Sequence, residues 1–168
     1  MKRRRELVLI IVIIVAIFAL NEGIKIVTGS NVPLAIVDGR SMIPTFHEGD
    51  VVLVVGVKPS DIRVGDIIVY KVSDKLIIHR VIEISINDGK YFFRTKGDNN
   101  PVPDLNLVSE DQVVGRVFGV ILPRIGVLIS KFLLPYKYIV VALLIALIII
   151  IILWPQRKDV KIEAKGHV

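Results

Sequence analysis

The chain has no cysteine among its 168 residues. Disulfides, thiolate nucleophiles and Cys-ligated metal sites are therefore excluded. Histidine is scarce as well, because only His47, His79 and His167 are present. The sequence also has no internal repeat of 20 to 50 residues and no low-complexity tract, which argues against solenoid and fibrous architectures.

What the chain has in excess is apolar residues, at 53% of the total, which is high for a soluble domain. The formal net charge is +6, and much of the basic charge lies near the two ends, in "KRRR" and "QRKDVK". Each basic cluster flanks a long apolar run. Basic clusters that flank apolar runs are typical of membrane proteins, where they set the orientation in the bilayer. Because this accounts for the basic charge, we expect no nucleic-acid partner.

The first apolar run is unbroken from Leu7 to Leu20 and continues more weakly to Val27. At about 1.5 Å per residue the unbroken part is short for a bilayer core of about 30 Å. With tilt, and with the side chains of Arg5 and Lys25 reaching the interfaces, the longer segment can span. The alternative is a cleaved signal peptide, but the small-residue cleavage pattern is poor. We therefore predict an uncleaved N-terminal anchor.

The second apolar run covers 138–154, with Tyr136, Tyr138 and Trp154 where interfacial aromatic residues usually lie. We predict a second transmembrane helix here. Basic residues at both ends favour the cytoplasmic side for both termini. The prediction is a two-pass protein of the cell membrane or the endoplasmic-reticulum membrane. Its segments are a basic tip and anchor (1–27), an extracytoplasmic or lumenal β-rich domain (28–137), the C-terminal helix (138–154) and a basic cytoplasmic tail (155–168).

The middle of the chain has the composition of β-strands. Short stretches rich in Val, Ile, Tyr and Phe alternate with turn signals such as "RVGD" and "NDGK". We predict a mainly β fold, a bent antiparallel sheet or partial barrel held between the two transmembrane helices. The expected strands are 51–57, 66–72, 75–86, 90–97 and 111–121.

A membrane-proximal segment, 119–136, is apolar with few charges and is interrupted by proline. Two interpretations are open. The segment is either a surface loop or amphipathic turn lying on the bilayer, or a strand and a short helix packed in the core.

The stretch "DGRSMIPTFHEGD" (38–50) places Ser41 in a tight turn before a strand. A nucleophilic serine needs a base and a group that orients the base. Of the three histidines, His79 lies inside the apolar strand pattern "KLIIHRVIEI" and can be held rigidly, although a lone strand histidine is more often a packed residue. The carboxylate candidates are Asp98 and Asp104 in "TKGDNNPVPD", where ordinary turn chemistry is the alternative.

Four motifs together, "SMIPTFHEGD", "VGDIIVY", "HRVI" and "KGDNN", occur in the order and approximate spacing of the type I signal peptidases. The chain resembles this family over roughly residues 34 to 126, together with the N-terminal anchor. The bacterial type carries lysine at the position of His79, whereas the archaeal and endoplasmic-reticulum type carries histidine. The sequence therefore resembles the second subgroup.

The resemblance implies a membrane-bound serine endopeptidase that removes N-terminal signal peptides from exported preproteins, cutting after small residues at positions −1 and −3. It implies Ser41 as nucleophile, His79 as general base and Asp104 as the third member, with Asp98 as a supporting acid of the same site. It implies no cofactor and no metal. The expected partners are preprotein signal peptides, the lipid bilayer and the secretion translocon.

Residues around the nucleophile complete the predicted substrate and oxyanion region. Gly39 permits the turn, Pro44 stiffens its exit and Met42 helps to wall an apolar pocket. The family often has serine in place of Gly39, where its hydroxyl assists the oxyanion hole, and commonly glycine in place of Arg40. The backbone N–H of Ser41 can still donate, whereas the second oxyanion donor is left open.

Two other classes compete with this interpretation. Self-cleaving repressor domains share the fold family but use serine and lysine, and the membrane anchors and His79 argue against them. A non-catalytic membrane-tethered β domain, which binds peptides or assists secretion, is the other alternative. It predicts that Ser41 and His79 are dispensable.

Overall fold

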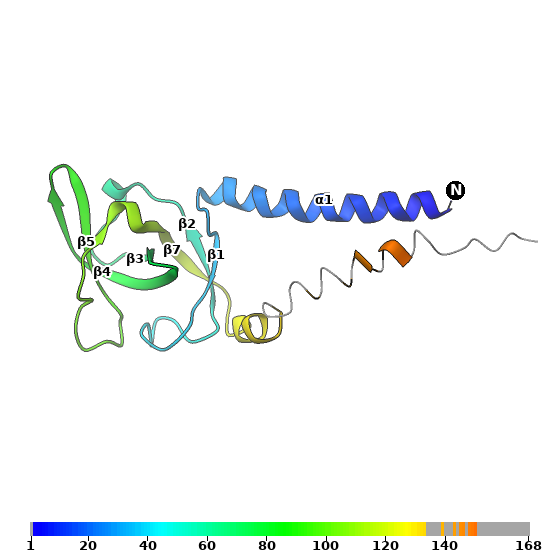
Figure 1. The fold of residues 1–168 in the computed structure, drawn as a ribbon. Helices are drawn as coiled ribbons and strands as arrows, with labels where there is room; N and C mark the ends of the chain where they lie inside the picture. The colour runs from blue at the N-terminus through cyan, green and yellow to red at the C-terminus, as the bar shows by residue number, and fades with distance from the viewer. Residues whose placement is uncertain (1, 134–138, 140–142, 144, 147, 151–168) are drawn as a thin grey trace, which may run out of the picture.

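The computed structural model describes residues 2–133, 139, 143, 145, 146 and 148–150. A long N-terminal helix is followed by a sheet domain and a short helical segment (Figure 1). The elements are α1 (Lys2–Thr28), β1 (Leu34–Ile36), β2 (Val51–Val55), η1 (Pro59–Asp61), β3 (Ile67–Val72), β4 (Lys75–Asn87), β5 (Lys90–Lys96), β6 (Val108–Ser109), η2 (Glu110–Gln112), β7 (Val113–Leu122), α2 (Gly126–Leu128) and η3 (Ile129–Leu133).

The seven strands form one sheet in the order β1-β2-β7-β3-β4-β5-β6, and every neighbouring pair is antiparallel. The sheet is open, with β1 and β6 at its edges. The predicted mainly β, antiparallel fold is thus confirmed. The five predicted strands correspond to β2, β3, β4, β5 and β7. The two edge strands were not predicted, because elements of three and two residues carry almost no periodic signal.

Strand β3 separates two hydrophobic clusters. Val69 belongs to a cluster with Met42 and Phe46, whereas Ile68 and Tyr70 belong to a cluster with Phe93. Successive residues of a strand point to opposite faces, so the two clusters lie on opposite faces of β3.

The register also places three polar residues on one face. His79 of β4 pairs with Ile68, and Thr95 of β5 pairs with Val81. Directly paired residues share a face, and Val81 lies two residues from His79. Tyr70 of β3 lies two residues from Ile68, so Tyr70, His79 and Thr95 lie on the same face of three adjacent strands.

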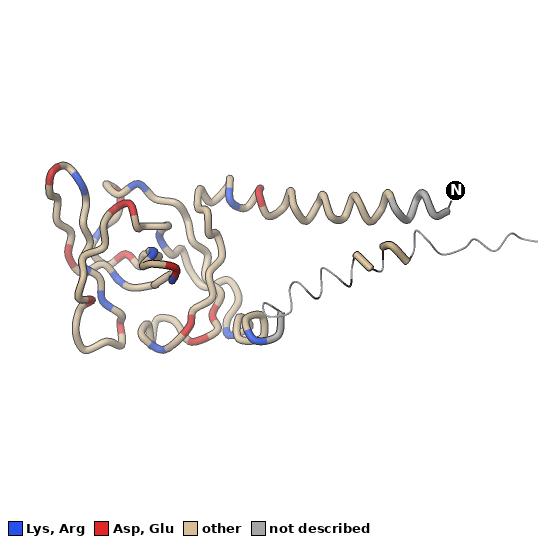
Figure 2. Tube along the Cα trace, in the orientation of Figure 1, with Lys and Arg blue, Asp and Glu red and all other residues tan. Residues whose placement is uncertain are grey.

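Helix α1 extends away from the sheet (Figure 1). Its segment Val8–Thr28 has a mean hydropathy of 2.4 and is exposed over most of its length, with Thr28 buried at the end that meets the sheet domain. It is the one helix in the described part of the chain that is long and apolar enough to cross a membrane. Beyond its first turns, the charged positions of the helix lie near the sheet domain (Figure 2). Glu22 and Lys25 form an ion pair of 2.8 Å.

The predicted C-terminal helix (138–154) falls largely on residues outside those described, and the basic tail (155–168) falls entirely outside them. The segment 119–136 is described as far as Leu133. It continues β7 to Leu122 and then forms α2 and η3, so the strand and short helix match the second interpretation. Its packing does not, because Ile121, Leu122 and Leu128 are exposed while Gly126 is buried.

The joint between helix and sheet is tight. Gly29 ends the helix with a φ of 65°, a conformation that favours glycine. The N–H of Gly56 donates to the carbonyl of Thr28 at 2.8 Å, and a Cβ on Gly56 would collide with the Gly29 carbonyl. Ser30 is 2% exposed. Helix α1 therefore joins the sheet domain directly, without a free linker.

Candidate active site

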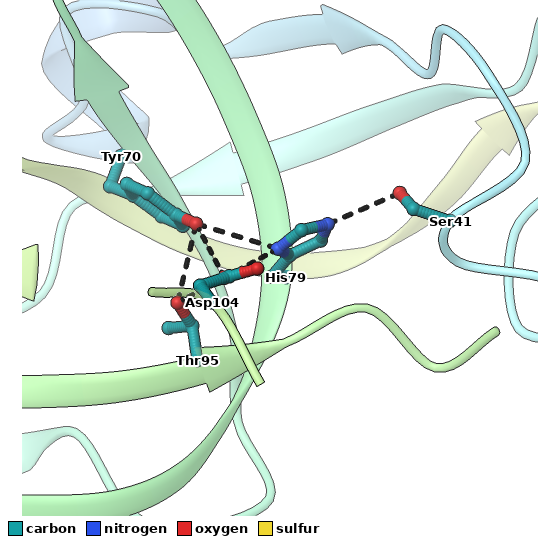
Figure 3. Close-up of polar contacts among 5 residues, drawn as sticks. All are labelled: Ser41, Tyr70, His79, Thr95 and Asp104. Atoms are coloured by element: carbon teal, nitrogen blue, oxygen red, sulfur yellow. Dashed lines mark hydrogen bonds and ion pairs between the residues drawn. The ribbon is translucent and has the colours of Figure 1, made fainter. Parts of the chain in front are cut away.

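Three polar side chains from distant segments meet beside strand β4 (Figure 3). Ser41 lies in the loop after β1, His79 in β4, and Asp104 in the loop between β5 and β6. The Oγ of Ser41 is 3.2 Å from His79 Nε2, and His79 Nδ1 is 2.7 Å from Asp104 Oδ2. In the tautomer that these contacts favour, Nδ1–H donates to the carboxylate and Nε2 accepts from the serine hydroxyl.

The turn that carries Ser41 is fixed by its own neighbours. Gly39 has a φ of 86°, in the left-handed region that favours glycine. Met42 is 1% exposed and packs in the cluster of Phe46 and Val69. The N–H of Phe46 donates to the carbonyl of Met42 at 2.9 Å, which closes a turn that includes Pro44. Burial of Met42 thus holds the preceding Ser41 at the surface beside His79.

The "KGDNN" segment brings its loop against this turn. A Cβ on Gly97 would lie 2.7 Å from the carbonyl oxygen of Ser41, so glycine is required for the close approach. The N–H of Asn99 donates to the same carbonyl at 2.7 Å, and the Asn99 side chain donates to the carbonyl of Arg40 at 3.2 Å. The loop that carries Asp104 is therefore bonded directly to the loop that carries Ser41.

Asp98 lies in the same loop, but its hydrogen-bond partners among the described residues are Arg80 and Thr45. The guanidinium of Arg80 donates to both carboxylate oxygens, at 2.8 and 2.7 Å, and Thr45 donates at 2.5 Å. Thr45 belongs to the Ser41 turn, and Arg80 follows His79 in β4. Asp98 therefore ties the turn to the strand, whereas Asp104 contacts the imidazole.

Two residues at the site were missed from the sequence, Tyr70 and Thr95. The Tyr70 hydroxyl donates to Asp104 Oδ2 at 2.9 Å, and Thr95 Oγ1 donates to the same oxygen at 2.6 Å. A weak signal existed for Thr95. It alternates with Phe93 and Tyr91 in β5, which places a hydroxyl on a buried face where it needs a partner.

The electrostatics follow from these contacts. Burial alone would raise the pKa of Asp104, but hydrogen bonds from Thr95, His79 and Tyr70 outweigh it and hold that pKa below its ordinary value. Burial, together with the neighbouring Asp104, raises the pKa of Tyr70 above its ordinary value although the Thr95 contact opposes this. Tyr70 therefore stays a neutral hydrogen-bond donor. Hydrogen bonds from Arg80 chiefly lower the pKa of Asp98.

Two hollows adjoin the site. A pocket of about 160 Å³ lies beside Ser41 and is lined mainly by apolar residues of the β1 region and of β4, including Met42 and Ile78. A larger groove of about 450 Å³ adjoins Asp104 and Tyr70 and is lined mostly by the loop 100–108. Within the described part of the chain, no group of three His, Asp or Glu residues is placed to hold a metal ion.

The chain is similar to a known peptidase family and to several known proteins. Residues 13–118 match the family model of the S24-like peptidases (Peptidase S24-like). The signal peptidase complex catalytic subunit of Rattus norvegicus is 38% identical over 141 residues, which cover 77% of this chain and 73% of the rat protein.

Two further relatives carry the same description. The catalytic subunit of Homo sapiens is 42% identical over 115 residues, covering 62% of this chain and 59% of the human protein. That of Dictyostelium discoideum is 40% identical over 115 residues, covering 62% of this chain and 63% of its own length. The chain thus spans less than two thirds of these two relatives. It belongs to the S24-like peptidase family, and within that family to the type I signal peptidases of the endoplasmic-reticulum kind.

Proposed function

We propose that this chain is a membrane-anchored serine endopeptidase that removes N-terminal signal peptides from exported preproteins. The observation that carries the proposal is the contact chain from Ser41 Oγ through His79 to Asp104 in a member of a peptidase family. The 3.2 Å contact between Oγ and Nε2 is at the upper end of hydrogen-bond reach, as is common before substrate binds.

In the proposed mechanism, Oγ of Ser41 attacks the scissile carbonyl while its proton passes to Nε2 of His79. The Asp104 carboxylate holds the imidazole in the required tautomer and stabilises the imidazolium that forms. The backbone N–H of Ser41 donates to the developing oxyanion. The imidazolium then protonates the leaving amine of the mature protein. Water, activated by His79 in the same way, hydrolyses the acyl-enzyme and releases the signal peptide.

The apolar pocket of about 160 Å³ beside Ser41 is the candidate site for the −1 side chain of the substrate. The proposed cleavage after small residues at −1 and −3 follows from membership of the signal peptidase family. Strand β1 lies at the free edge of the sheet just before the Ser41 loop, so an extended peptide can be aligned there by strand addition.

The membrane arrangement is also a proposal. Helix α1 spans the bilayer as an anchor, a second helix crosses at 138–154, and the basic segments at both ends remain in the cytoplasm. The sheet domain then works on the outer or lumenal side, with the bilayer and the secretion translocon as its surroundings. The proposed segments are those predicted from the sequence, 1–27, 28–137, 138–154 and 155–168.

The test is cleavage of a preprotein by the detergent-solubilised chain, with Ser41→Ala as the key variant. We expect turnover to fall on the order of 10⁶-fold, as when other serine proteases lose the nucleophile, while far-ultraviolet circular dichroism is unchanged. Ser85→Ala is the matched control, since Ser85 is exposed on β4 near the far end of the strand. Cleavage by Ser41→Ala at the wild-type rate would refute the role of Ser41 as nucleophile, whereas no cleavage by the wild type would favour the non-catalytic β domain.

A further inference from the structure

One oxygen of Asp104 receives more donors than a catalytic triad requires. Oδ2 lies 2.7 Å from His79 Nδ1, 2.9 Å from the Tyr70 hydroxyl and 2.6 Å from Thr95 Oγ1 (Figure 3). The Tyr70 hydroxyl also lies 3.4 Å from His79 Nδ1 and 3.2 Å from Thr95 Oγ1. Three polar groups therefore converge on a single carboxylate oxygen.

The two hydroxyls are fixed more firmly than the carboxylate that they contact. Tyr70 is 2% exposed and Thr95 is fully buried, and their strands β3 and β5 flank the strand of His79. Asp104 belongs to a loop, and its N–H donates to the carbonyl of Thr95 at 2.9 Å. The sheet thus supplies a rigid frame, and Thr95 holds both the backbone and the side chain of the loop residue.

The groove of about 450 Å³ beside Asp104 explains why the carboxylate needs fixed donors. Asp104 and Tyr70 both line the groove, so a carboxylate without fixed donors could rotate towards solvent there. Each buried hydroxyl that would lose its acceptor opposes that rotation, because an unpaired buried donor is costly. The arrangement holds Oδ2 on the line to the imidazole.

We propose that Tyr70 and Thr95 are positioning residues of the peptidase, whose hydroxyls keep Asp104 Oδ2 aimed at His79 Nδ1 and so maintain the imidazole tautomer that leaves Nε2 free to accept the Ser41 proton. The inference rests on the proposed function and deepens it. Neither residue contacts Ser41. In the proposed tautomer the Tyr70 hydroxyl and Nδ1–H of His79 both direct their hydrogens at Oδ2, so the 3.4 Å between them is a contact of two donors and both residues act through Asp104.

Three conservative variants separate the hydroxyl from the bulk of the side chain. Tyr70→Phe keeps the ring and removes the donor. Thr95→Val keeps the shape and removes the donor, while Thr95→Ser keeps the donor and removes a methyl group. Because the raised pKa of Tyr70 keeps its hydroxyl neutral, the loss in Tyr70→Phe is that of a hydrogen bond and not of a charge.

The experiment measures kcat and KM for a preprotein with the full chain in detergent. We expect Tyr70→Phe and Thr95→Val each to lower kcat about tenfold, the effect of one hydrogen bond to a charged group. KM should be unchanged because the substrate is not touched. Thr95→Ser should restore most of the rate, and in an Asp104→Asn background neither hydroxyl deletion should lower kcat further.

A second measurement does not depend on cleavage. In the ¹⁵N-histidine-labelled chain, the Nδ1 proton of His79 should give a downfield resonance that shifts in Tyr70→Phe and Thr95→Val but not in Thr95→Ser. A folded Thr95→Val protein with wild-type kcat would overturn the proposal. So would a loss of kcat that persists at full size in the Asp104→Asn background. If the wild type cleaves no preprotein, the proposed function fails, whereas an unshifted resonance rejects the positioning role itself.

Discussion

The ion pair between Asp98 and Arg80 allows a prediction with a definite size. Asp98→Asn keeps the shape of the side chain but leaves the Arg80 guanidinium without its charged partner. The two side chains are 15% and 33% exposed, so the pair is neither on the open surface nor fully buried. Breaking exposed pairs costs about 0.2–1 kcal/mol, and breaking buried ones costs about 3–5 kcal/mol.

We therefore expect Asp98→Asn to lower the free energy of unfolding by about 2 kcal/mol. For a domain of this size the corresponding fall in Tm is roughly 10 °C. Cleavage should weaken less than in Asp104→Asn, because Asp98 holds the Ser41 turn through Thr45 and does not contact His79. The measurements are thermal unfolding by circular dichroism and the cleavage rate, made on the same purified samples.

The dependence of this effect on pH has a definite sign. Because Arg80 lowers the pKa of Asp98, the native state keeps the carboxylate ionised at lower pH than the unfolded chain does. The stabilisation is complete above the unfolded pKa of about 3.9 and is lost as the pH falls through the folded pKa. The difference in Tm between wild type and Asp98→Asn should therefore persist from about pH 7 to 5 and narrow below about pH 4.

Asp111→Asn is the matched control for this series. Its carboxylate is paired with Lys90 at 3.4 Å, and the two side chains are 72% and 58% exposed, so its loss should hardly move Tm. An unchanged Tm in Asp98→Asn at pH 7 would refute the structural role given to the pair. If Asp98→Asn is inactive but folded while Asp104→Asn cleaves normally, the roles of the two aspartates are reversed.

Two further predictions concern Asp104 and the joint between α1 and the sheet domain. Asp104→Asn keeps the shape but removes the charge that orients His79, and it should lower turnover by up to roughly 10⁴-fold. Because the pKa of Asp104 is lowered in the fold, its charge also stabilises the protein, so Tm should fall as well; preprotein cleavage and thermal unfolding measure the two effects. Gly56→Ala places a methyl group against the carbonyl of Gly29 and should cost about 1–3 kcal/mol of stability. Gly23→Ala in α1, with open space around the new methyl group, should be neutral, and equal melting of the two alanine variants would show that the joint is not tight.

Much of the architecture was predictable because its signals are local. A strand that is buried on at least one face needs a run of apolar, β-branched residues between turn formers. This condition located β2, β3, β4, β5 and β7 to within a few residues. The apolar run at the N-terminus likewise predicted α1, because a long apolar stretch is a local signal for a helix. The helix ends at Thr28, one residue beyond the predicted end. The edge strands β1 and β6 form only by pairing with longer strands, so no local sequence pattern predicts them.

The candidate site was also predicted in part from the sequence and in part only from the structure. Sequence motifs placed Ser41, His79, Asp98 and Asp104 in one region, and their assignment to catalytic roles stays a prediction. Spacing and composition could not separate the two aspartates, because both lie in one loop of turn-forming residues, and only the family resemblance favoured Asp104 as the third member. The three-dimensional course of the loop places Asp104 against His79 and turns Asp98 towards Arg80.

The sequence by itself thus determined the apolar helix, the strand-rich middle and the residue types available for chemistry, since each depends on side chains close together along the chain. Only the tertiary structure decided which hydroxyls surround the carboxylate. Tyr70 and Thr95 are 25 residues apart, and they meet because the register of β3, β4 and β5 places them on one face of the sheet. Register is set by pairing between strands and by the turns that connect them, and no single stretch of sequence contains that information.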